Sequence, residues 1–135
     1  MNNIDRYRNQ HKIILSIGKA LADASEYTIS DKEFSSYFSV LKTLDEVLSS
    51  HLDSEDNYFY PELARDKNST IQSISKRLQT EMLPISIVYE NYKKKYSSTE
   101  KILDNKDSFV DETVFLVESL NRRIEKEEKE LYSLL

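Results

Sequence analysis

Residues 30–61 decide the fold, and their sequence is SDKEFSSYFSVLKTLDEVLSSHLDSEDNYFYP. Ser30 and Glu33 have the spacing of a capping box, in which two side chains satisfy free backbone N–H groups at the start of a helix. Apolar side chains then recur every three or four positions, which is typical of a helix with one face in a core. This stripe predicts a helix over residues 31–60 and comprises Phe34, Tyr37, Leu41, Leu44, Leu48, His51, Glu55 and Tyr58. Pro61 is expected to end or kink the helix, because proline has no N–H to donate and clashes with the preceding turn.

Three further segments show the same periodicity and predict helices at about residues 4–24, 70–96 (or to 103) and 109–134. The end of the second of these helices is open, because residues 97–100 (SSTE) can either cap a short extra helix or continue the long one. Pro84 is expected to bend the same helix just beyond Met82. Four helices of roughly 20–30 residues with short connections are typical of a bundle. The sequence therefore predicts an all-α, antiparallel up-down four-helix bundle that forms one domain over residues 1–135.

Composition excludes several other classes of protein. One Gly and two Pro in 135 residues are too few for β-hairpin turns or glycine-rich nucleotide loops, and the absence of Cys excludes disulfides, thiolate ligands and cysteine nucleophiles. The net charge of −5 and a single basic run at residues 93–95 argue against a nucleic-acid partner. No apolar stretch approaches the ~20 residues of a membrane span, and the first residues do not form an apolar leader. We therefore expect a cytoplasmic protein without a membrane partner.

Polar residues interrupt the apolar stripes at one level of the predicted bundle. In antiparallel helices two residues face each other when their numbers average to the middle of the connection, because both helices rise by the same distance per residue. This rule places six residues in roughly one layer: His11, His51, Glu55, Met82, Arg123 and Glu127. The pairs His51/Glu55 and Arg123/Glu127 are each four residues apart, so each pair lies on one helix face. Metal centres in helix bundles are built from such inward-pointing pairs.

The same layer is also compatible with a metal-free core. A single histidine on a core stripe is commonly a hydrogen-bonded structural residue, and a His/Glu pair one turn apart can be a local side-chain contact. Arg123 carries a permanent charge, so its guanidinium can fork to carboxylates across the core and take the place of a metal ion. Alternatively, Arg123 can extend along its apolar stem to solvent.

Three other residues are candidates for a pocket or for the surroundings of this layer. Gly18 lies on the same stripe as His11, and its missing side chain leaves either a small-ligand pocket or room for a large neighbour such as Tyr89 or Tyr92. Tyr7 and Tyr58 lie on their helix stripes close to the layer. Their hydroxyls are expected to lie within reach of its polar groups.

The residues of this layer resemble those of the hemerythrin-like family, four-helix bundles with a di-iron centre between histidines and carboxylates. Residues 51–61 (HLDSEDNYFYP) are similar to the family signature H-x-x-x-E-[ED]-x-x-[LF]-[FY]-P. Residues 123–132 (RIEKEEKELY) resemble the family's second copy of that pattern, except that Arg123 stands where the histidine belongs. Met82 stands at the ligand histidine of the third helix, and the surroundings of His11 match the first ligand helix. The resemblance covers essentially the whole chain.

Carried over residue by residue, the resemblance implies four metal ligands, namely His11, His51, Glu55 and Glu127. It also implies that the ligands of a second ion have been replaced at Met82 and Arg123. Two imidazoles and two carboxylates suit one Fe(II), Mn(II) or Zn(II) ion, whereas a thioether is a poor ligand for iron.

We therefore expect a hemerythrin-like protein with a reduced, mononuclear site for iron or a similar divalent metal. Sensing of O₂, NO or metal status is a role that such a site could serve. Its partners would then be a metal ion and a small diatomic ligand, and no protein partner is indicated. The alternative is a helical interaction or regulatory module without a metal, in which the His/Glu/Arg layer is a structural polar network. An enzyme is less favoured, because no catalytic residues in the form of a nucleophile–base pair are evident.

Overall fold

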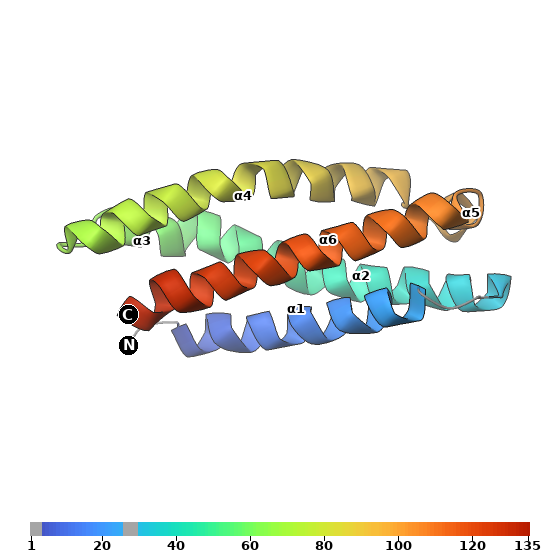
Figure 1. Ribbon diagram of the computed structural model, residues 1–135, viewed down its shortest axis with the longest axis horizontal. Coiled ribbons are helices and arrows are strands. Elements are labelled where there is room, and N and C mark those ends of the chain that lie inside the picture. The colour runs from blue at the N-terminus through green and yellow to red at the C-terminus, as the bar shows by residue number, and fades with distance from the viewer. Residues whose placement is uncertain (1–3, 26–29) are drawn as a thin grey trace.

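The computed structural model describes residues 4–25 and 30–135, and the elements among them are all helical (Figure 1). In chain order they are α1 (Ile4–Ser25), α2 (Asp31–Ser54), the π-helix η1 (Glu55–Phe59), α3 (Tyr60–Leu63), α4 (Ser69–Lys95), α5 (Thr99–Leu103), α6 (Lys106–Lys126), the π-helix η2 (Glu127–Leu131) and the 3₁₀-helix η3 (Tyr132–Leu134). Three of these, α2, η1 and α3, follow one another without a break, and so do α6, η2 and η3.

Four long helical rods lie side by side, formed by α1, by α2 with its continuation, by α4, and by α6 with its continuation (Figure 1). Successive rods run in opposite directions, and both chain ends lie at the same end of the bundle. This confirms the predicted all-α antiparallel bundle. None of the helices in the described ranges has the length and apolar character needed to cross a lipid bilayer.

Side-chain caps mark the starts of α2, α4 and α5. The Ser30 hydroxyl oxygen accepts the backbone N–H of Glu33 at 3.3 Å, and Asn68 accepts the N–H groups of the first turn of α4. Ser98 caps α5 in the same way, because its hydroxyl accepts the N–H of Lys101 at 3.2 Å. Of the two possibilities for residues 97–100, the structure therefore has the short extra helix.

Neither proline ends a helix. The rod that begins with α2 continues past Pro61 to Leu63, so of the two predicted effects of Pro61, an end or a kink, the end is wrong. Pro61 is the second residue of α3 and follows the π-helix η1 closely. Pro84 lies inside α4, on its exposed side, and α4 stays continuous while it curves over the bundle (Figure 1).

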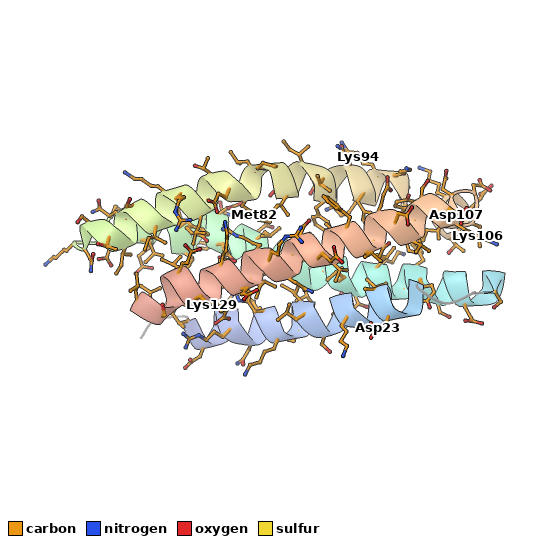
Figure 2. All side chains as sticks on the ribbon, viewed as in Figure 1. Asp23, Met82, Lys94, Lys106, Asp107 and Lys129 are labelled. Carbon is orange, nitrogen blue, oxygen red and sulfur yellow. The ribbon has the colours of Figure 1, made fainter. Side chains whose placement is uncertain are left out.

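The core consists of two apolar clusters. One occupies the half of the bundle near the chain ends and includes Ile4, Tyr7, Phe59, Leu78, Leu131 and Tyr132. The other occupies the opposite half and includes Ile14, Leu44, Leu48, Tyr89, Phe109 and Leu120. Charged side chains such as Lys94 and Lys129 lie on the outside (Figure 2). Since His11 lies between Tyr7 and Ile14 on α1, the polar layer is enclosed between the two clusters.

Gly18 serves packing at one helix crossing. A Cβ atom added to Gly18 would lie 3.3 Å from Val117 Cγ1 and 3.6 Å from Val117 Cγ2. The space beside Gly18 is thus filled by Val117, which is itself buried. The expected neighbours, Tyr89 and Tyr92, are wrong, because only Val117 side-chain atoms lie within 4 Å of that Cβ position among the described residues.

Candidate metal centre

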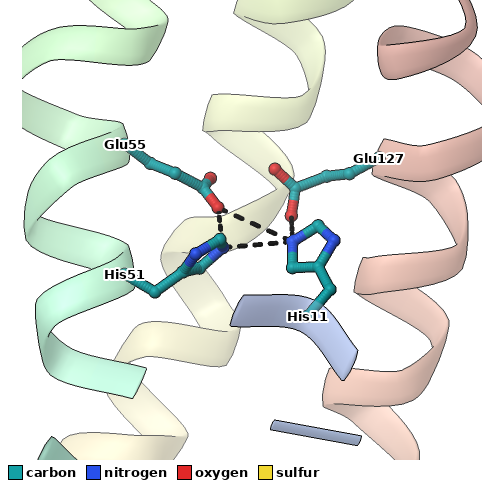
Figure 3. A group of neighbouring side chains, drawn as sticks. All are labelled: His11, His51, Glu55 and Glu127. Carbon is teal, nitrogen blue, oxygen red and sulfur yellow. Dashed lines mark hydrogen bonds and ion pairs between the residues drawn. The ribbon is translucent and has the colours of Figure 1, made fainter. Parts of the chain in front are cut away.

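Four buried side chains meet where the two core clusters join (Figure 3). They are His11 of α1, His51 of α2, Glu55 at the start of η1 and Glu127 at the start of η2, each 1–2% exposed. One nitrogen or oxygen atom of each lies within 4.8 Å of those of the other three. The two histidine Nε2 atoms are 3.1 Å apart, and His11 Nε2 lies 3.6 Å from Glu127 Oε1. Metal–ligand bonds of ~2.1 Å place neighbouring donor atoms ~3 Å apart and opposite ones ~4 Å apart, so the cluster has the dimensions of a metal site.

Both histidines are oriented by hydrogen bonds from their other ring nitrogen. His51 Nδ1 donates to Gln10 Oε1 at 2.7 Å, and His11 Nδ1 donates to Glu128 Oε1 at 2.9 Å. Glu128 in turn pairs with Arg8 at 3.2 Å on the surface. With the proton held on Nδ1, each Nε2 presents its lone pair to the centre of the cluster, which is the arrangement of metal-ligating histidines.

Several acceptor atoms in the cluster face one another without a hydrogen-bond donor between them. Glu55 Oε1 lies in close contact with His51 Nε2 but has no hydrogen-bond partner among the described residues. The two Nε2 lone pairs also face each other. Buried acceptors in such contact are unfavourable unless a cation lies between them. Two nitrogen and two carboxylate donors fit a divalent ion such as Fe(II), Mn(II) or Zn(II).

Arg123 lies one turn before Glu127 and is 5% exposed. Its Nη1 donates to the backbone carbonyl of Leu78 at 2.5 Å, and its Nη2 donates to the Tyr60 hydroxyl at 2.7 Å. Its Nε lies 3.5 Å from Glu127 Oε1. The guanidinium therefore remains in the core, and the alternative in which it extends to solvent is wrong. The fork between two carboxylates is also wrong, because Arg123 pairs with only one of them.

Met82 is buried on α4 at the same level (Figure 2). The preceding residue, Glu81, points to the surface, where it pairs with Arg77 and Lys126. Met82 offers only a thioether, which is a weak ligand for hard divalent ions. The half of the layer that contains Met82 and Arg123 therefore has no imidazole.

Two tyrosines that the helical periodicity missed also reach the layer. The π-helices η1 and η2 each begin at a cluster carboxylate, Glu55 and Glu127. A π-turn contains one residue more than an α-turn, so the fifth residue after each carboxylate takes the inward place. These residues are Tyr60 and Tyr132, which are 2% and 1% exposed. The repeated E-x-x-x-x-Y spacing, EDNYFY and EEKELY, is the only sequence signal that could have indicated them.

The extra residue in the π-turn also explains why the prediction for Tyr58 is wrong. Tyr58, expected beside the layer, is 71% exposed, because the π-turn rotates it away from the core. Tyr7, also expected there, does pack against the layer, with its ring centroid 5.6 Å from that of His51. Its hydroxyl, however, is 3.1 Å from the hydroxyl of Ser54.

Gln10 and Glu128 were likewise missed as partners of the two histidines. Each adjoins a cluster residue in sequence, but neighbouring helical residues point about 100° apart. Each therefore reaches the histidine of another helix: Gln10 of α1 contacts His51, and Glu128 of η2 contacts His11.

The pKa values of the two buried carboxyl groups shift in opposite directions. Burial and the nearby Glu127 raise the pKa of Glu55 well above its usual value. Burial opposes charge on Glu127 too, but its contacts with His11 and Arg123 outweigh it and lower the pKa of Glu127. Burial and the neighbouring His11 lower the pKa of His51 to about 4. Arg123 thus favours the charged form of Glu127, whereas burial disfavours the charged form of Glu55, and a bound cation would favour the charged form of both carboxylates.

Comparison with known proteins agrees with this site. A family model described as the hemerythrin HHE cation-binding domain matches residues 2–135, nearly the full chain. Searches of curated proteins and of solved structures give no match. The match confirms the family resemblance that residues 51–61 and 123–132 predict. On this evidence, the chain belongs to the hemerythrin HHE cation-binding domain family.

Proposed function

We propose that this protein binds one divalent metal ion, iron in the first place, and uses it to sense a small diatomic ligand or the metal itself. The ligands in this proposal are His11, His51, Glu55 and Glu127. The observation that carries it is the pair of Nε2 atoms 3.1 Å apart, both with their protons held on the far side of the ring. Such an arrangement of lone pairs is stabilised by a cation.

The residues around the proposed metal have different roles. A bound iron would supply a Lewis-acidic, redox-active centre with room for a small ligand. Gln10 and Glu128 hold the two imidazoles with Nε2 inward. The rings of Tyr7 and Tyr132 pack on His51 and His11 and keep bulk water out.

A single ion is proposed because of what stands in the other half of the layer. Arg123 keeps its positive charge at any physiological pH and so repels a second cation. Its guanidinium is held there by Leu78 and Tyr60. Met82 adds no ligand that iron binds well.

Metal analysis tests this proposal. Protein reconstituted with Fe(II) and then desalted is expected to hold one ion per chain. Its free energy of unfolding should rise by about 2.7 kcal/mol when free metal is 100 times the dissociation constant. His51→Gln should abolish both effects, whereas Glu125→Gln, at an exposed carboxylate paired with Lys129, should retain them. Two tightly held ions per chain would contradict a mononuclear site.

The metal-free module is the second candidate. The network of Arg123, Tyr60 and Glu127 favours it, because its hydrogen bonds of 2.7 Å use protein groups alone. In that case Fe(II), Mn(II) and Zn(II) would all leave the unfolding temperature unchanged, and His51→Gln would alter stability equally with and without metal.

Glu128 and Gln10 provide a further prediction about metal affinity. Glu128→Gln preserves an oxygen that can accept from His11 but removes the negative charge that makes the imidazole a stronger ligand. We expect metal binding about 10-fold weaker, measured by competition with a chelator. The reciprocal change Gln10→Glu should strengthen binding through His51. Glu125→Gln is the control, since it makes the same change of charge at an exposed carboxylate that pairs with Lys129. Identical affinities for all four proteins would show that the Nδ1 partners do not tune the site.

A further inference from the structure

The hydroxyls of Tyr60 and Tyr132, the two tyrosines that follow the π-helices into the core, differ in their hydrogen bonds. The Tyr60 hydroxyl donates to Glu127 Oε2 and accepts from Arg123 Nη2, both at 2.7 Å. The Tyr132 hydroxyl has one such contact within the described residues, to His11 Nε2 at 3.5 Å. Hydroxyl donors normally lie ~2.7–2.8 Å from their acceptors. The Tyr132 hydroxyl therefore makes only a long contact, and its partner is the His11 atom to which the proposed metal would bind, so with the metal bound this hydroxyl would lose that acceptor.

The surroundings of Tyr132 hold that hydroxyl in place. Its ring is stacked on the His11 ring, with centroids 5.2 Å apart and planes 3° apart, and the edge of Phe59 packs against it at 5.5 Å. The hydroxyl thus stays beside Nε2, the His11 atom that faces the proposed metal. A tyrosine hydroxyl is protonated at neutral pH, so the group is a donor and not a phenolate.

The net charge of the layer indicates which kind of ligand the Tyr132 hydroxyl would contact. Arg123 and a divalent ion contribute +3, and Glu55 and Glu127 contribute −2, so the loaded layer carries +1 with neutral histidines. A monoanion would neutralise it. The ligand must also be small, because the layer is closed by aromatic rings on the side of the chain ends.

A surface pocket lies at that end of the bundle. This pocket of about 360 Å³ is lined by Tyr7, Phe59 and the exposed Tyr58, among others. The Tyr7 ring also packs on His51 and the Phe59 ring on Tyr132. One layer of aromatic rings therefore separates the pocket from the hydroxyl.

From these observations we propose that the Tyr132 hydroxyl donates a hydrogen bond to a small monoanion bound at the metal. Tyr132 would then select ligands that have an acceptor atom. The inference rests on the proposed metal site, since without the ion the layer has no excess positive charge.

Azide is a suitable probe, because it is a small monoanion with acceptor atoms. Iron-loaded, air-oxidised wild-type, Tyr132→Phe and Tyr92→Phe proteins would be titrated with azide by visible absorption, and iron content measured in parallel. Oxidation to Fe(III) raises the charge of the loaded layer from +1 to +2, so the layer still attracts a monoanion. We expect Tyr132→Phe to bind azide about 10-fold more weakly with unchanged iron content. The infrared stretch of bound azide should shift as well, which loss of packing alone would not cause. Tyr92→Phe is the matched control, because its buried hydroxyl bonds Thr113 in the other half of the bundle.

The outcomes separate this inference from the proposed function. Equal azide affinity and an unshifted stretch in Tyr132→Phe would overturn the role of Tyr132. Failure of the iron-loaded wild type to bind azide would overturn it too, while leaving the metal site intact. Failure of the wild type to retain iron would overturn both.

Discussion

Replacing Arg123 by methionine is expected to lower the free energy of unfolding of the metal-free protein by about 3–5 kcal/mol. The guanidinium is 5% exposed and contacts Glu127 at 3.5 Å, so its removal leaves a buried carboxylate without its cation. It also leaves the Leu78 carbonyl and the Tyr60 hydroxyl without the donor that each now has. Methionine fills most of the volume, so the loss reports the charge and hydrogen bonds more than a cavity.

Urea unfolding of chelator-treated protein measures this effect. Arg122→Met is the matched control, because the neighbouring Arg122 is exposed and its change should stay within about 0.5 kcal/mol. A similar small loss for Arg123→Met would mean that Glu127 is neutral or solvated without metal, and the description of the layer as an Arg–Glu ion pair would be wrong.

Introducing imidazoles at Met82 and Arg123, the two positions that we propose were replaced, is expected to convert the site to one that holds two ions. Met82 and Arg123 are both buried at the level of the retained carboxylates. Met82→His combined with Arg123→His would supply two nitrogen donors in place of a weak ligand and a repelling charge. Glu55 and Glu127 would then lie between two pairs of histidines. We expect iron content to rise from one to two ions per chain, with di-iron absorption in air.

The single variants serve as controls for this design. Arg123→His alone removes the partner of Glu127 without completing a site and should be the least stable of the three variants. Met82→His alone keeps the repelling guanidinium and should still bind one ion. With excess iron the double variant should regain stability through binding. A folded double variant that takes up no more iron than the parent would show that these two positions are not the replaced ligand positions.

The level of the polar layer was predictable from the sequence. Helical periodicity and the equal rise of antiparallel helices depend only on residue spacing, and they placed six residues at one height. All six are buried: His11, His51, Glu55, Met82, Arg123 and Glu127. The bundle itself was predictable for the same reason, since its long stripes alternate every three or four residues without interruption over most of their length.

The contacts within the layer were decided by the tertiary structure. Gln10 and Glu128 each contact a histidine on another helix, so no spacing along one helix reveals these pairs. Arg123 could have faced solvent or two carboxylates, and the position of the Leu78 carbonyl on α4 and of Tyr60 decides its direction.

The π-helices are the clearest case. One extra residue in a turn rotates everything after it by about 100°, which moves Tyr58 out and brings Tyr60 in. The local preference of a residue for an α- or a π-turn is small, whereas the burial of a large aromatic ring beside Glu127 and Arg123 is a large term. Because that term arises only when the four rods are packed together, the sequence by itself determined the layer, and the assembled bundle decided which tyrosines complete it.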